Sequence, residues 1–138
     1  MDFETLAAFT EKGKFYFSEK DKLAVECNAP NLPGIYIIYA KHSDGLELRF
    51  VGSSGTISQN GTFGANTLKH RMLIRRDGSD REEFLRKKLR SEHLDYFEIH
   101  WFVTFRDNVK YLPRSVEGCL IQEYFQQFQK LPPWNKEY

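Results

Sequence analysis

Residues 34–52 read GIYIIYAKHSDGLELRFVG, and this stretch decides the fold. Residues 34–40 are apolar at both odd and even positions, which is typical of a strand covered on both faces. Residues 43–45 are Ser-Asp-Gly, and Asp-Gly between two apolar runs is a strong hairpin signal. The run over residues 46–52 then returns as the second strand. The stretch therefore predicts an antiparallel β-hairpin.

The chain after the hairpin predicts helices and one more strand. Asp77-Gly78 breaks a helical pattern, and Ser79 and Glu82 have capping-box spacing at the start of another helix. Pro113 suits the first turn of a last helix. In order, we expect a Ser/Gly/Asn-rich loop over 53–66, a helix from 66 or 67 to about 76, a helix from 79 to about 92, a strand over 96–105 and a helix over roughly 113–130.

The order of these elements predicts an α+β fold, with a small antiparallel sheet and helices packed around it. Residues 1–32 are interpreted as an N-terminal extension packed on a domain of residues 33–138. Within the extension, the apolar spacing over residues 2–12 predicts a short amphipathic helix, and residues 14–33 read as irregular.

Composition narrows the class of protein. The 138 residues are 41% hydrophobic and 15% aromatic, which excludes a disordered chain, and a net charge of +1 gives no general field for nucleic acid. Cys27 and Cys119 stand far apart, which excludes a disulfide scaffold and a zinc site of the usual spacing. We see neither a signal-peptide pattern nor an apolar run of about 18 residues, and expect a soluble, cytoplasmic, single-domain protein.

Glu117 is the strongest anomaly in the last predicted helix. At helical periodicity it falls in the middle of the apolar stripe that contains Val116, Leu120 and Tyr124. A carboxylate in that position must be paired, bound to a metal or protonated, because a buried uncompensated charge costs several kcal/mol. The alternative is a first-turn glutamate whose side chain leaves past the helix end, favoured by the helix dipole.

A basic segment is hidden by the overall neutrality. Residues 66–91 hold nine Lys or Arg against four acids, a balance that suits phosphate contact, although a solvated helix face explains most of them individually. Arg71 lies at the edge of the apolar face of its helix, where its guanidinium could point into a cleft. The other candidates for nucleic-acid contact are Lys69, His70, Arg75 and Arg76.

Taken in order, these residues resemble the GIY-YIG nuclease family. The first signature is matched by Gly34-Ile35-Tyr36, and Phe50-Val51-Gly52 stands where the second, Tyr-Ile-Gly, belongs. The family's arginine, glutamate and late asparagine are matched by Arg71, Glu117 and Asn135, so the resemblance covers residues 34–135. It implies a three-stranded antiparallel sheet flanked by helices, and DNA cleavage with one divalent ion.

The resemblance also implies roles for these residues. Tyr36 would orient or activate the attacking water, and Arg71 would clamp the phosphoryl oxygens. Glu117 would hold Mg²⁺ or Mn²⁺, and Asn135 would position Tyr36 or the metal shell.

Three features depart from the family pattern. Phe50 offers no hydroxyl, Arg75 stands where the family often has His or Tyr, and the loop over 53–66 is long. Two alternatives to an endonuclease stay open: a non-catalytic nucleic-acid-binding module on the same scaffold, and an unrelated α+β interaction domain in which Glu117 caps a helix. An endonuclease of this size would dimerise, recruit a partner protein or cut one strand only; DNA is the expected partner and a membrane is not.

Overall fold

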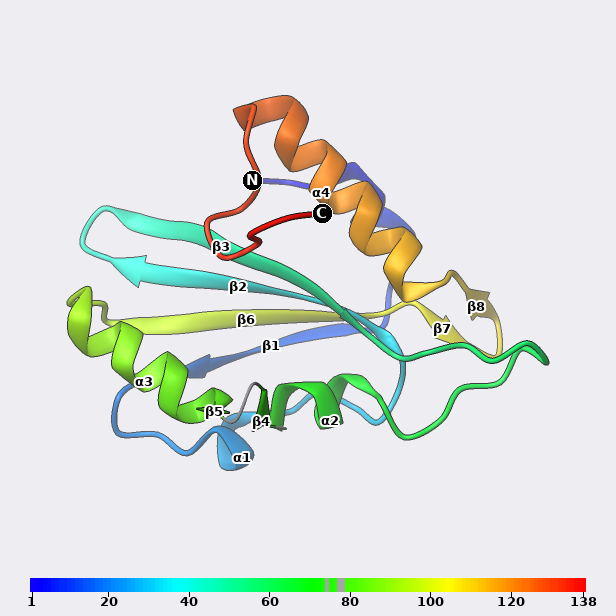
Figure 1. Ribbon diagram of the computed structural model, residues 1–138, viewed down its shortest axis with the longest axis horizontal. Helices are drawn as coiled ribbons and strands as arrows, with labels where there is room; N and C mark the ends of the chain where they lie inside the picture. Colours follow the sequence, from blue (N-terminus) through cyan, green and yellow to red (C-terminus); the bar gives the residue numbers. More distant parts are fainter. Residues whose placement is uncertain (74, 77–78) are drawn as a thin grey trace.

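The computed structural model describes residues 1–73, 75–76 and 79–138, with residues 75, 76 and 79 described by their backbone alone. It confirms an α+β fold built on an antiparallel sheet (Figure 1). The sheet has four strands in the order β1-β6-β2-β3. These strands are β1 (Lys12–Phe17), β6 (Tyr96–Val103), β2 (Gly34–His42) and β3 (Gly45–Ser54).

The predicted hairpin is confirmed as β2 and β3. The two strands pair from Gly34 opposite Ser54 to His42 opposite Gly45, with an irregularity after Ile38. Gly45 closes the turn with φ of 123°, in the region that favours glycine. The hairpin is therefore fixed locally by Asp-Gly turn chemistry and apolar strands.

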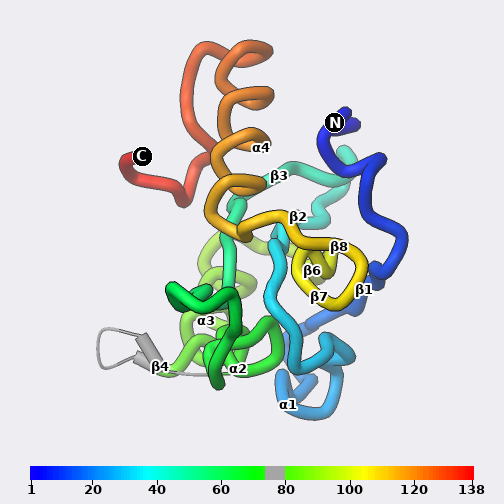
Figure 2. The backbone as a smooth tube through the Cα atoms, turned by 90° about the vertical axis from the view of Figure 1, so that its right-hand side faces the viewer, coloured from blue at the N-terminus to red at the C-terminus, as the bar shows by residue number. Residues whose placement is uncertain are grey.

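Helices cover both faces of the sheet (Figure 2). On one face, α2 (Leu68–Leu73) and α3 (Arg81–Ser91) pack against the even-numbered side chains of β2, such as Tyr36. On the other, α4 (Pro113–Phe128) packs against the odd-numbered ones, such as Ile35. The apolar residues of β2 at both parities are explained by these two cores. No helix in the described ranges is long and apolar enough to cross a membrane.

The prediction of three strands is wrong, because the sheet has four. The additional strand, β1, comes from the N-terminal extension. β1 pairs along β6, and Phe15 and Phe17 point inward from it and are almost completely buried. β6 pairs with β2 along one edge and with β1 along the other. This pairing and the burial of the two rings outweigh the low strand propensity of the neighbouring lysines. The predicted helix over residues 2–12 is reduced to a 3-10 turn, η1 (Glu4–Ala8), and a one-turn helix, α1 (Leu23–Glu26), lies in the segment read as irregular.

The boundaries around α3 also differ from the prediction. α2 ends at Leu73, and β4 (Arg75–Arg76) pairs with β5 (Ser79–Asp80) where a continuing helix was expected. The predicted break at Asp77-Gly78 lies outside the described residues. α3 is capped by Asp80, whose carboxylate accepts a hydrogen bond from the Glu82 N–H at 3.0 Å, so the cap is one residue later than the predicted Ser79.

The last predicted strand is divided near its end. β6 stops at Val103, and a short hairpin of β7 (Phe105–Arg106) and β8 (Val109–Lys110) leads into α4. Pro113 occupies the first turn of α4, as predicted, because its missing N–H needs no partner there.

Candidate functional site

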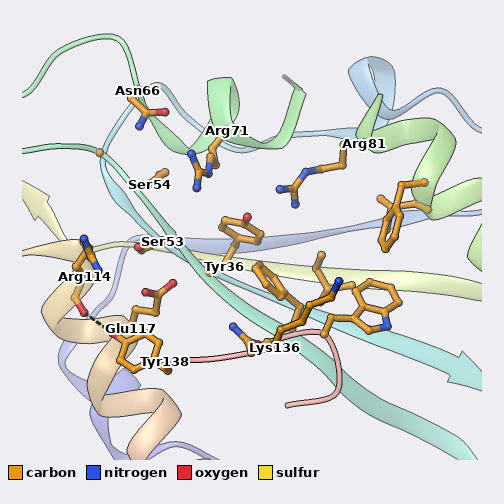
Figure 3. Close-up of a pocket in the computed structure, with 18 of the residues that line it drawn as sticks. Tyr36, Ser53, Ser54, Asn66, Arg71, Arg81, Arg114, Glu117, Lys136 and Tyr138 are labelled. Carbon is orange, nitrogen blue, oxygen red and sulfur yellow. Dashed lines mark hydrogen bonds between the residues drawn. The ribbon is translucent and has the colours of Figure 1, made fainter. Parts of the chain in front are cut away.

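A cavity of about 890 Å³ runs along the edge strand β3 and is lined by residues of α2 and α3 from one face of the sheet and of α4 from the other. This volume lies in the range of small-ligand pockets, about 300–1,000 Å³. Figure 3 shows the side chains that converge on it from β2, β3, α2, α3, α4 and the C-terminal segment. The residues that line it include Tyr36, Phe50, Gly52, Ser53, Arg71, Arg81, Phe84, Arg114, Glu117, Trp134, Asn135, Lys136 and Tyr138.

Tyr36 forms the floor of the cavity and is held there by a glycine. The whole residue is 1% exposed, and its neighbour across the hairpin is Gly52. A Cβ at residue 52 would lie 2.7 Å from Tyr36 Cζ and 2.8 Å from Tyr36 Oη, so a side chain there would displace the phenol. Residue 34 must be glycine for a similar reason, since a Cβ there would overlap the backbone carbonyl of Phe102. Both glycines of the two signature-like triplets are thus required by close packing.

Arg71 reaches the cavity from α2, on the same side of the sheet as Tyr36 (Figure 3). Its Nε is buried, and no hydrogen-bond partner for that atom is present in the described part of the chain. A buried donor without a partner costs about 1–3 kcal/mol, so such a group is usually explained by a ligand or water. Arg71 therefore lines the cavity with a guanidinium whose Nε is left unpaired by the described residues.

Arg81 is a site residue that sequence reasoning missed. It is the first residue of α3, and its guanidinium carbon lies 5.4 Å from the centre of the Tyr36 ring. This is the distance of a cation–π contact, so Arg81 and Gly52 together fix the ring of Tyr36. The sequence placed Arg81 only in the basic segment, because its position over Tyr36 depends on how α3 packs.

Glu117 turns its half-buried carboxylate into the cavity from α4 (Figure 3). Burial raises the pKa of this carboxyl, and four neighbours oppose that rise: the hydroxyls of Ser53 and Tyr138 and the charges of Arg114 and Arg71. The alternative interpretation from the sequence was that this side chain leaves past the helix end, whereas it lines the cavity. The carboxylate is thus partly desolvated and within reach of the Arg71 charge.

Asn135 lies at the cavity but contacts β3 instead of Tyr36. Its Oδ1 accepts a hydrogen bond from Val51 N at 3.0 Å, and its Nδ2 donates one to Val51 O at 2.9 Å. The side-chain amide therefore pairs with the edge of β3 as another strand would. These two bonds anchor the C-terminal segment on β3, and the expected role of Asn135 toward Tyr36 or the metal shell stays a prediction.

The C-terminal segment after α4 forms the remaining wall. Trp134 packs edge-on against Phe84 at 5.3 Å between ring centres, and Tyr138 Oη donates a hydrogen bond to Arg114 O at 3.3 Å. The sequence showed no signal for Trp134, Lys136 or Tyr138, since a polar tail with one Trp is compatible with many positions.

Four further residues were predicted to contact nucleic acid, and the described lining of the cavity includes none of them. Lys69 and His70 are exposed on α2, outside the described lining. Arg75 and Arg76 form β4 through their backbone, and their side chains lie outside the described part of the structure. Phe50, the departure from the second signature, does line the cavity, with its ring centre 5.9 Å from that of Tyr36.

The lining fits a divalent ion of the Mg²⁺ type better than a metal held by protein alone. The described residues contain no group of three or more His, Cys, Asp or Glu that could hold a metal ion. Mg²⁺ commonly takes one or two carboxylates and completes its shell with water and substrate oxygens. Glu117 offers one such carboxylate, while Asp80 and Glu137 also line the cavity.

No family model, curated protein or solved structure matches the chain. The likeness to GIY-YIG nucleases rests on the residues of this chain alone.

Proposed function

We propose that the protein is a metal-dependent DNA endonuclease of the GIY-YIG type that hydrolyses a phosphodiester bond in the cavity along β3. One observation carries the proposal: Tyr36, Arg71 and Glu117 come from three elements far apart in the chain and line one cavity. A purely structural role for each of them would not require a common cavity, whereas phosphodiester hydrolysis requires an oriented water, a cation and a metal ligand together.

Arg71 is the residue that would bind the phosphate. Its buried Nε lacks a partner among the described residues, and a guanidinium can donate two parallel hydrogen bonds to non-bridging phosphate oxygens. Lysine cannot reproduce this fork. Arg71 would stabilise negative charge that grows on those oxygens during hydrolysis.

Glu117 is the residue that would hold Mg²⁺ or Mn²⁺. Burial disfavours the charged form of its carboxyl group, so a cation beside it would offset the desolvation. A bound divalent ion supplies charge neutralisation at the scissile phosphate. A single carboxylate binds such an ion weakly, so DNA would complete the metal site.

Tyr36 would orient the attacking water. Its phenol is fixed between Gly52 below the ring and Arg81 above it, so it keeps one direction without a flexible stem. Asn135 supports the site indirectly, because it holds the C-terminal segment on β3.

A non-catalytic nucleic-acid-binding module is the second candidate, and Phe50 is the observation that favours it. The second signature position carries no hydroxyl, and no other phenol except Tyr138 joins Tyr36 in the described lining. Such a module would use the same cationic cavity without hydrolysis.

Nicking of supercoiled plasmid in Mg²⁺ or Mn²⁺ tests the proposal. We expect cleavage by the wild type, none by Glu117→Gln, and wild-type cleavage by Glu137→Gln, which removes an exposed carboxylate of the same cavity. Absence of cleavage by the wild type in both metals would overturn the endonuclease. Salt-dependent DNA binding in that case would identify the binding module, since phosphate contacts release counterions.

A further inference from the structure

Aromatic side chains line the part of the cavity between β3, α3 and the C-terminal segment. Phe84 and Trp134 pack edge-on, and Phe50 lies beside Tyr36. Phe84 is 43% exposed although it is a large apolar residue. An exposed ring at a cavity wall leaves apolar surface in water, which a flat apolar ligand would cover.

Two cations accompany these rings. Arg81 and Lys136 both line the cavity, and Figure 3 shows Arg81 on the side of Tyr36 away from Glu117 and Arg114. Aromatic faces next to positive side chains are the combination with which proteins bind single-stranded nucleic acid, by stacking of bases and by attraction of the backbone.

The distance between the two ends of the cavity suits a nucleotide. Ser53 marks the Glu117 end, and Phe50, which also lines the cavity, marks the aromatic end. These residues are three positions apart on β3, about 10 Å. A ligand that fills both ends must extend well beyond one phosphate group.

We propose that the aromatic end of the cavity, formed by Phe50, Phe84 and Trp134, is a stacking subsite for one unpaired nucleobase of a DNA strand whose phosphate lies at Arg71. This inference rests on the proposed function for the position of the phosphate. Bases inside a duplex are stacked on their neighbours, so only an unpaired or extruded base can enter the cavity. The substrate is therefore DNA with a single-stranded or distorted region.

The subsite is compatible with Phe50. Phenylalanine lacks the hydroxyl of the signature tyrosine and keeps an aromatic face for stacking. The departure from the signature thus fits recognition of a base at this position.

Fluorescence anisotropy with labelled ten-nucleotide DNA strands tests the subsite. The probes are one single strand, its blunt duplex, and a set of single strands in which one base at a time is replaced by an abasic residue. We expect wild-type protein to bind the single strand more tightly than the duplex. At one position, the abasic replacement should weaken binding about tenfold to hundredfold, since one stacked base contributes about 1–3 kcal/mol.

Phe84 variants assign this effect to the proposed wall. Phe84→Ala and Phe84→Leu should weaken single-strand binding about tenfold and remove the penalty of the abasic replacement, while Phe84→Tyr should keep both. The matched control is Phe125→Ala, because Phe125 is also 43% exposed on a helix but lies outside the described lining. Equal effects of Phe84→Ala and Phe125→Ala, or no penalty at any abasic position, would overturn the subsite.

The two proposals fail separately. Metal-dependent cleavage with no dependence on any single base would overturn the subsite and leave the endonuclease standing. Base-dependent binding without cleavage would support the subsite and overturn the endonuclease. Absence of binding to every DNA probe would overturn both.

Discussion

Gly52→Ala is expected to damage the site and the fold through one added carbon atom. The new Cβ would lie 2.6 Å from Phe50 Cε2, 2.7 Å from Tyr36 Cζ and 2.8 Å from Tyr36 Oη. Ordinary contacts begin at 3.4 Å, so these rings must move by about 0.6–0.8 Å. Tyr36 is buried and Arg81 lies over its ring, so the movement strains the packing. Overpacking of this kind costs about 1–3 kcal/mol of stability.

The same displacement should reduce DNA cleavage, because a shift of about 1 Å at a reacting group costs about 100-fold in rate. Urea unfolding followed by tryptophan fluorescence gives the stability, and plasmid nicking gives the rate. Gly64→Ala is the control, since a Cβ at residue 64 meets nothing within 4 Å. Wild-type stability and wild-type cleavage in Gly52→Ala would refute the close packing of Tyr36 on the hairpin.

Three further predictions concern the other residues of the cavity. Arg71→Lys keeps the charge and loses the two-pronged donor, so nicking should fall at least tenfold while the urea midpoint stays near the wild-type value; unchanged nicking would remove Arg71 from the mechanism. Burial raises the pKa of Glu117, so its stabilising contribution is present at acid pH and is lost as pH rises through that pKa. Glu117→Gln should therefore exceed the metal-free wild type in stability at pH 7, with a gap that closes as pH falls below the ordinary glutamate pKa of about 4.3; a constant gap would contradict the desolvation. Asn135→Ala removes both hydrogen bonds to Val51 and should cost about 1–3 kcal/mol by urea unfolding, and no loss would show that the segment is held elsewhere.

Much of the fold follows from local signals in the sequence. The hairpin over residues 34–52 is specified by its turn and its strands, and the helix at Pro113 by its first-turn proline. β1 was missed because Phe15 and Phe17 alternate over too few residues, between lysines and a glycine. Its strand character comes from pairing with β6, some eighty residues later in the chain.

The candidate site was predictable where one residue conflicts with its surroundings. Glu117 on an apolar stripe and Arg71 at the edge of another are such conflicts, and both side chains line the cavity. Arg81 and Trp134 conflict with nothing locally; they reach the cavity only because α3 and the C-terminal segment pack beside β3. Tertiary placement of this kind leaves no periodic trace in the sequence.

The central claim is that Glu117 holds one divalent ion beside Tyr36 and Arg71 when DNA is bound. Electron paramagnetic resonance of Mn²⁺ measures this directly, as the amount of ion bound to the protein–DNA complex beyond that bound to DNA alone. We expect about one additional Mn²⁺ for the wild type and for Glu137→Gln, and none for Glu117→Gln. Equal Mn²⁺ binding by the wild type and Glu117→Gln would contradict the claim.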